Sequence, residues 1–218
     1  MVFIAVIVKT TKSYRMNLKL TPFQYQALIG LMLGDLCAER GKITHNTRLS
    51  FDQGKIHAAY VYHLYELFSP LINMGIHTTN RLPDIRTGNI YVSLMFKTLA
   101  FPVLNVFREM FYFPSYGKGT KILPSDLADH FTAVSFAYWI MDDGTYAQGI
   151  LKICTDNFTL DQVQFLCDML FDKYGIVCHA QQRKANMYRL YIASREMDKV
   201  RTLVAPYLIP SMRYKVGL

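Results

Sequence analysis

Two apolar stretches of the chain each end abruptly in acidic residues. The first is ALIGLMLGDL, residues 27–36, which closes on Asp35, and the second is SFAYWIMDDGTY, residues 135–146, which closes on Asp142 and Asp143. Each run is apolar on all sides, as is typical of a buried helix. Asp143 lies about half a chain length after Asp35. This spacing suggests that the chain contains two copies of one unit.

The first copy opens with a helix and a strand. Thr21 and Pro22 suit a helix start, and the apolar pattern predicts a helix from Phe23 to Leu33. Polar and apolar residues then alternate over 42–52, which predicts a strand with one polar face. That polar face carries Arg48, Ser50 and Asp52, and the opposite face carries Leu49 and Phe51.

The remainder of the first copy predicts two more helices and a hairpin. Helical spacing over 55–73 predicts an amphipathic helix, and 77–96 predicts a hairpin that turns at 87–89. A third helix fits 100–111. The apolar positions expected to face the core are Ala59, Tyr62, Leu64, Leu67, Phe68 and Leu71 in the helix and Ile90, Val92, Leu94 and Phe96 in the hairpin.

The same order of elements recurs after a segment rich in Pro, Gly and Ser at 112–130. The second copy predicts a helix from 131, a strand at 149–155, a helix at 159–174, a hairpin at 177–193 and a helix at 195–207. We therefore expect an N-terminal extension at 1–20, a first half at 21–115, a linker at 116–130 and a second half at 131–218.

Composition narrows the class of protein. The chain of 218 residues is 51% hydrophobic, enough for a substantial core, and carries a formal net charge of +8, which favours a polyanionic partner or an anionic membrane surface. The apolar run VFIAVIV at 2–8 is far shorter than the roughly 20 residues of a membrane span, and we expect it to be a short strand or a remnant. The four cysteines lack zinc-site spacing, so we expect reduced packing residues and an intracellular or intra-organellar setting.

The paired acids have a chemical interpretation. A carboxylate at a helix C-terminus is disfavoured by about 0.3–1 kcal/mol when exposed, yet both apolar helices end in one. If the helices pack side by side, oxygen-ligated Mg²⁺, with Mn²⁺ as substitute, would neutralise Asp35 and Asp143. Gly30 and Gly34 form a small face that would let the second helix approach closely. Taken singly, each acid is more often an ordinary helix-ending residue.

Basic and amide side chains supply candidates for phosphate and base contacts. Lys121 and Lys215 stand at matching places in the two copies, where each could steady phosphate charge or tune a nucleophilic water. Arg48 and the two hairpins carry residue types that read base edges, although polar strand faces are also simply solvated. The hairpin candidates are Asn80, Arg81, Arg86 and Asn89 in the first copy and Gln181, Gln182, Arg183, Lys184 and Arg189 in the second.

The stretches LIGLMLGDL and FAYWIMDDG resemble the two copies of the motif that names the LAGLIDADG homing endonucleases. The second copy, followed near the end by PYLIPSMRYK, is especially similar to single-chain members encoded in organellar introns. The resemblance extends from about residue 22 to the end. It implies an α+β monomer with two pseudo-symmetric αββαββα halves, whose motif helices form the central interface and whose antiparallel sheets form a saddle over DNA.

The resemblance also implies roles for individual residues. The final acid of each motif, Asp35 and Asp143, would ligate the catalytic metals, and Lys121 and Lys215 would lie near the scissile phosphates. Asp52 corresponds to a further polar residue on the first strand. The chain departs from the family pattern at two places: Leu36 replaces the motif's last glycine, and Cys154 falls near the position that would pair with Asp52. The role of Asp142 stays open.

The implied function is metal-assisted hydrolysis of one phosphodiester in each strand of a long DNA target, leaving a double-strand break with short 3′ overhangs that promotes intron homing. The implied location is a mitochondrion or a chloroplast, with no membrane partner. An RNA maturase that assists splicing of its host intron is the alternative, because a basic surface serves RNA as well. A regulator that has lost catalysis is disfavoured, because both motif acids are present.

Overall fold

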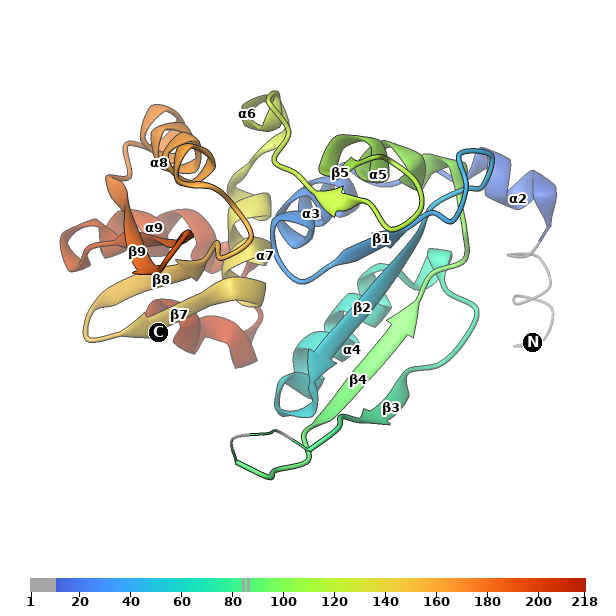
Figure 1. Cartoon of the computed structure of the whole chain (residues 1–218), viewed down its shortest axis with the longest axis horizontal. Coiled ribbons are helices and arrows are strands. Elements are labelled where there is room, and N and C mark those ends of the chain that lie inside the picture. The colour runs from blue at the N-terminus through green and yellow to red at the C-terminus, as the bar shows by residue number, and fades with distance from the viewer. Residues whose placement is uncertain (1–10, 84, 86) are drawn as a thin grey trace. The chain divides into compact units, whose positions relative to one another are not determined.

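The computed structural model of the chain describes residues 11–83, 85 and 87–218. The contacts divide the chain into two compact units, each described by itself (Figure 1). The first unit comprises the described residues up to Tyr25 together with Asp35–Thr120, and the second comprises Gln26–Gly34 together with Lys121–Leu218. Most of the first apolar helix therefore packs in the second unit. The run at 2–8 and the candidate Arg86 lie outside the described residues.

The first unit is built on a four-stranded antiparallel sheet in the order β1-β2-β4-β3. Phe51 and Phe96 stack at 4.4 Å between ring centroids on one face of the sheet, and Phe51 also contacts Phe68. Helix α4 supplies buried Tyr60 and Leu64 to the core of the unit. The elements are α2 (Lys12–Asn17), β1 (Cys37–Glu39), β2 (Arg48–Gly54), α4 (Ala58–Leu67), β3 (His77–Asn80), β4 (Val92–Lys97), α5 (Asn105–Phe111) and β5 (Tyr112–Phe113).

The second unit repeats this arrangement with the strand order β7-β8-β10-β9. Leu151, Ile153, Leu190 and Ile192 are fully buried on one face of the sheet. The elements that follow β6 (Thr120–Lys121) are α6 (Leu127–His130), α7 (Ala133–Asp143), β7 (Gly144–Ala147), β8 (Ile150–Cys154), α8 (Leu160–Tyr174), β9 (Cys178–Lys184), β10 (Met187–Ile192) and α9 (Met197–Val204). The predicted α+β class with two sheet-containing halves is confirmed.

The two apolar helices form as the sequence predicts. Helix α3 (Pro22–Leu33) starts where Thr21 and Gln24 exchange hydrogen bonds between side chain and backbone, a reciprocal cap. Helix α7 starts with a similar cap formed by Thr132 and Ser135, and its residues 134–141 are all buried. Burial on every side explains why neither helix shows an amphipathic pattern.

Several predictions about individual elements are wrong. The strand predicted over 42–52 begins only at Arg48, because the Arg40 guanidinium donates to the carbonyls of Ile43 and His45 and holds the preceding residues as a loop. The short strands β1 and β7 after the acids were not predicted, since three or four residues carry too little alternation. The segment 112–130 is not purely a linker, as β5, β6 and α6 form within it.

The predicted core-facing positions also need correction. In α4 the buried face consists of Tyr60, Val61 and Leu64, so Ala59 and Tyr62 face solvent. Ile90 is 59% exposed, because β4 begins only at Val92 and the register of the strand does not reach it. All four cysteines are free, but Cys37 is exposed and does not pack in the core.

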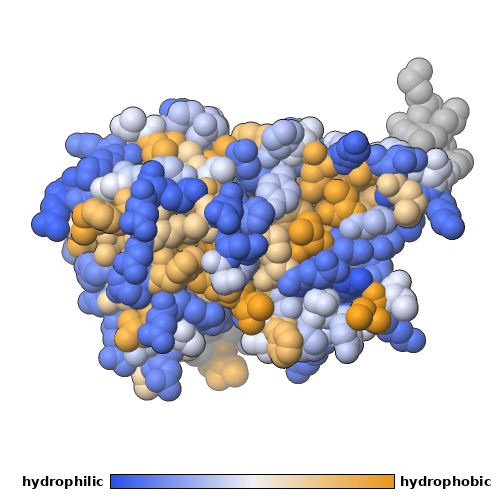
Figure 2. Space-filling model, turned by 90° about the horizontal axis from the view of Figure 1, so that it is seen from above, coloured by the Kyte–Doolittle hydropathy of each residue, from blue (hydrophilic) through white to orange (hydrophobic). Residues whose placement is uncertain are grey.

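On the face seen in Figure 2, groups of hydrophobic residues are exposed between hydrophilic residues. Among the described helices, each is too short or too polar to span a membrane.

Candidate nuclease site

The contact between α3 and α7 within the second unit positions the candidate site. Gly30 lies directly against the backbone carbonyl of Ser135, so that a Cβ at this position would overlap the carbonyl oxygen. One turn later, a Cβ at Gly34 would lie 2.6 Å from the Cβ of Asp142. The predicted small-residue face and the close approach of a second helix are confirmed.

This contact gives Asp142 a structural role. Its side chain packs on Gly34, while Asp35 and Asp143 are the residues that follow these two in the chain. At the other end of the contact, the Ser135 hydroxyl donates to the Gln26 carbonyl at 2.8 Å. Asp142 therefore belongs to the helix interface.

The two candidate lysines bind equivalent backbone groups. Lys121 Nζ donates to the Gly34 carbonyl at 2.6 Å, and Lys215 Nζ donates to the Asp142 carbonyl at 2.8 Å. Each of these carbonyls belongs to the residue immediately before a motif acid. A cation at a helix C-terminus is favourable, because the last carbonyls lack partners within the helix. The ammonium groups therefore offset the charge of carboxylates at unfavourable helix ends.

The C-terminal segment holds Lys215 in place. Lys215 is buried in a 3-10 helix, Pro210–Val216, and Arg201 donates to the Val216 carbonyl at 2.9 Å. Arg201 also donates to the Tyr146 hydroxyl on β7 at 3.0 Å, which ties the C-terminal segment to the strand after Asp143. The lysine that the sequence placed near the end of the chain is thus fixed beside α7.

The strand side chain that lies near the motif acid is not the same in the two units. In the first unit the Gln53 amide donates to Asp35 Oδ2 at 2.9 Å, whereas Asp52 pairs with Arg81 on the other side of β2. The structure therefore brings Gln53, and not Asp52, to the motif acid. Alternation places residues 49, 51 and 53 on one side of the strand, but it does not tell which side reaches Asp35.

In the second unit Cys154 at the end of β8 lies near Asp143. Burial raises the pKa of the Cys154 thiol, and the negative charges of Asp143 and Asp156 raise it further. The next residue, Thr155, is buried and donates its hydroxyl to the Tyr188 carbonyl at 2.7 Å. An amide comparable to Gln53 is therefore absent from the end of β8, where residues 154 and 155 are Cys and Thr.

Most of the predicted base-reading residues lie on the strands of the two sheets, while Asn89 lies in the connection between β3 and β4. Asn80, Asn89, Gln181, Gln182 and Lys184 are exposed. The arginines are held by acids: Arg48 pairs with Glu39 at 2.7 Å, Arg81 pairs with Asp52, and Asp156 binds both Arg183 and Arg189.

These acid pairs keep the basic side chains in defined positions. Hydrogen bonds from Arg189 and Arg183 lower the pKa of Asp156. Burial alone would raise the pKa of Glu39, but its bonds with Lys97 and Arg48 outweigh burial and lower it. Both carboxylates thus stay ionised near neutral pH, and the guanidinium groups around them are restrained before any ligand binds.

A divalent metal fits the donor set at the motif acids. The described residues hold no group of three or more His, Cys, Asp or Glu side chains arranged as a metal site. Mg²⁺ does not require one, because it is usually bound through one or two carboxylates, with water and substrate phosphates completing the octahedron. The hard oxygen donors of Asp35 and Asp143 match that preference.

Comparison with known proteins places the chain in a family. Residues 25–200 match the model of the LAGLIDADG DNA endonuclease family, and the chain belongs to this family. The cytochrome b mRNA maturase bI2 of Debaryomyces hansenii is 32% identical over 98% of this chain and 81% of the maturase. The intron-encoded endonuclease ai4 of Dictyostelium discoideum is 34% identical over 71% of this chain and 99% of its own length.

A solved structure confirms the fold independently. The homing endonuclease I-WcaI bound to its DNA recognition sequence superposes with a TM-score of 0.83, covering 95% of this chain and 93% of I-WcaI at 24% identity. The predicted family and fold are therefore confirmed.

Proposed function

We propose that this protein is a site-specific DNA endonuclease that cuts both strands of a long duplex target with the help of a divalent metal. The observation that carries the proposal is the matched pair of motif ends. The backbone carbonyl of the residue before each motif acid, Asp35 or Asp143, accepts a hydrogen bond from a lysine ammonium. Family membership and the relatives named as intron-encoded endonucleases support the same chemistry.

In this proposal Asp35 and Asp143 hold Mg²⁺, or Mn²⁺ in its place. When bound, the ion supplies Lewis-acid polarisation of the phosphate and a lowered pKa for bound water. The protein's own residues orient the reaction. Gln53 fixes the rotation of the Asp35 carboxylate, while Lys121 and Lys215 provide positive charge beside each acid as negative charge develops on the phosphate. Hydrolysis of one phosphodiester per strand leaves short 3′ overhangs.

The partner in this proposal is double-stranded DNA, bound by the protein as a monomer. The net charge of +8 favours the phosphate backbone, and the restrained arginines and exposed amides supply base contacts. The biological outcome is intron homing in an organelle. A mitochondrial setting is favoured by the maturase relative, which is named for cytochrome b mRNA.

Cleavage of a randomised DNA library tests this function. The purified chain is incubated with the library in Mg²⁺ or in EDTA, and the new ends are sequenced. The proposal expects one family of sites that share a common sequence, and no ends in EDTA. Ends that are absent in Mg²⁺, or that share no sequence, would contradict it.

The lysines give a prediction specific to the proposed site. Lys121→Ala or Lys215→Ala should slow cleavage by about 100-fold or more, while DNA affinity falls by less than about tenfold, because each acts on one phosphate among many contacts. Lys173→Ala is a matched control, since Lys173 also donates to a backbone carbonyl, that of Ala128, at 2.6 Å. Equal losses of rate and affinity would make the lysines electrostatic anchors.

Gln53 gives a second prediction. Gln53→Leu should slow one of the two strand cuts by about tenfold, because the Asp35 carboxylate loses the amide that orients it. Nicked plasmid should then accumulate before linear plasmid appears. Gln164→Leu removes an equivalent amide-to-carboxylate bond, 2.9 Å to Asp168, far from the motif ends in sequence. Unchanged nicking kinetics in Gln53→Leu would remove Gln53 from the positioning residues.

RNA binding is a second candidate function. The relative that covers 98% of this chain is named as an mRNA maturase, and its identity of 32% shows a common family rather than a common activity. Both activities can coexist on one chain if RNA is bound mainly by side chains other than those that contact DNA.

A further inference from the structure

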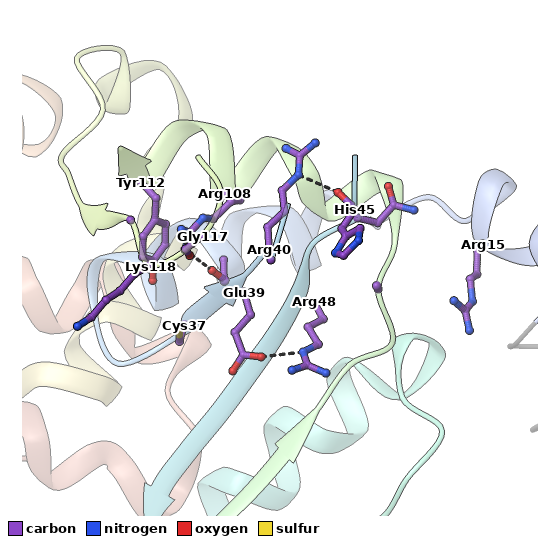
Figure 3. A pocket seen from close by; sticks show the side chains of 15 residues that line it. Arg15, Cys37, Glu39, Arg40, His45, Arg48, Arg108, Tyr112, Gly117 and Lys118 are labelled. Carbon is purple, nitrogen blue, oxygen red and sulfur yellow. Dashed lines mark hydrogen bonds and ion pairs between the residues drawn. The ribbon is translucent and has the colours of Figure 1, made fainter. Parts of the chain in front are cut away.

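A basic pocket of about 800 Å³ lies within the first unit (Figure 3). Neither motif acid is among the residues that line it. Its walls come from the edge strand β1, the loop after it, α2, α5 and the turn at 117–119. The lining includes five cationic side chains and a single carboxylate, Glu39. The cationic residues are Arg15, Arg40, Arg48, Arg108 and Lys118.

Two of these arginines build the walls. Buried Arg108 donates to the carbonyls of Ala38, Ser115 and Gly117 at 2.7–3.1 Å, and Arg40 donates to two loop carbonyls and to Glu109. Their hydrogen-bonding groups are engaged with the protein, but their charge remains. They therefore make the pocket electropositive while holding its shape.

Two further cations of the lining, Lys118 and Arg15, have no ion pair among the described residues. Lys118 is exposed, and its ammonium has no hydrogen bond or ion pair within the described part of the chain. Arg15 is half-buried, and its Nε has no hydrogen-bond partner among the described residues. Figure 3 shows these two side chains at opposite ends of the pocket, with Arg40, Arg48 and Arg108 between them. A ligand that spans the pocket can meet a cation at each end.

The volume and the positive charge of the pocket indicate the class of ligand that it can bind. A volume of about 800 Å³ is within the range of small-ligand pockets and accommodates a nucleotide. The Arg48 guanidinium, held at 2.7 Å by Glu39 and half exposed, offers a fixed plane on which a base can stack. A continuous duplex keeps its bases stacked and paired, so it cannot place a nucleotide in a concave site without flipping it. RNA bulges and loops present splayed nucleotides with no such cost.

We propose that this pocket, formed by Arg15, Arg48 and Lys118 around the β1 edge, binds an unpaired nucleotide of a structured RNA. The proposal rests on the second candidate function, RNA binding, and assigns it a place on the molecule. The pocket shares Arg48 with the candidate base-reading residues, so its test uses Arg15 and Lys118, which belong to neither the candidate nuclease site nor the base-reading residues.

The test compares RNA affinities of the full chain by fluorescence anisotropy. The probes are an RNA hairpin with a five-nucleotide bulge, the same hairpin fully paired, and the DNA version of the bulged hairpin. The double variant Arg15→Ala with Lys118→Ala should bind the bulged RNA at least about 10-fold more weakly. The matched variant Lys12→Ala with Lys19→Ala removes the same charge outside the pocket and should lose less than about threefold.

Cys37 supplies a readout on the unaltered chain, since this exposed thiol lines the same pocket. Bulged RNA should slow alkylation of Cys37 by iodoacetamide more than fully paired RNA does. Equal losses in the two double variants, equal affinity for bulged and paired RNA, or unprotected Cys37 would each overturn the proposal. DNA cleavage at a selected site should be unchanged in both double variants. Loss of RNA binding and loss of nuclease activity are therefore distinguished by separate measurements.

Discussion

Asp35→Asn and Asp143→Asn should each reduce double-strand cleavage by about 1,000-fold or more. Replacing the carboxylate with an amide removes the anionic oxygen that holds the metal, and loss of about 4 kcal/mol of transition-state stabilisation corresponds to this factor. Each side chain keeps its size, so the helix ends retain their packing. The measurement is conversion of supercoiled plasmid with a selected site to nicked and linear forms in Mg²⁺.

DNA affinity separates this effect from misfolding. Gel-shift affinity for the same site should stay within about tenfold of the unaltered chain, because most contacts go to phosphates elsewhere. Asp172→Asn provides a control, as Asp172 is an exposed carboxylate on α8. Full cleavage by either motif variant would remove that acid from the site.

Gly30→Ala should destabilise the protein although alanine is the better helix former. In an open helix this change would stabilise by about 1 kcal/mol. At Gly30, however, the new Cβ would overlap the backbone carbonyl of Ser135, which cannot rotate away as a side chain could. Overpacking of this kind costs about 1–3 kcal/mol, which lowers the melting temperature by about 2–12 °C in a chain of this size.

Two other glycines calibrate that result. Gly34→Ala should also destabilise, because its Cβ would lie 2.6 Å from the Cβ of Asp142, an atom held by the backbone of α7. Gly75→Ala should leave the melting temperature within about 2 °C, since nothing lies within 4 Å of its added Cβ. An unchanged or raised melting temperature for Gly30→Ala would show that α3 and α7 pack less closely than described.

The sequence predicted what depends on strong local patterns. The apolar runs around Asp35 and Asp143 predicted both buried helices, and the spacing of Gly30 and Gly34 predicted the close helix contact. The lysines were predicted from their matching places, but not their bonds to Gly34 and Asp142, because a backbone carbonyl leaves no trace in the sequence.

What the sequence could not predict depends on the register of strands. Asp52 and Gln53 are neighbours on one strand, and only the position of β2 against Asp35 decides which of them reaches the acid. Ile90 continues the alternation of β4, yet the strand starts two residues later. The pocket beside β1 could not be predicted from the sequence either, because its cations come from segments as distant in the chain as Arg15 and Lys118.

The central claim, that this chain cuts each strand of a DNA site once, is tested most directly by mapping the cleaved ends strand by strand. A duplex that contains the selected site is labelled on one strand or the other, digested in Mg²⁺ and run beside sequencing ladders. The account predicts a single cut in each strand, offset by a few nucleotides to leave 3′ overhangs, and loss of the paired cuts in Asp35→Asn and Asp143→Asn. Cuts in one strand only, or paired cuts that persist in both variants, would contradict it.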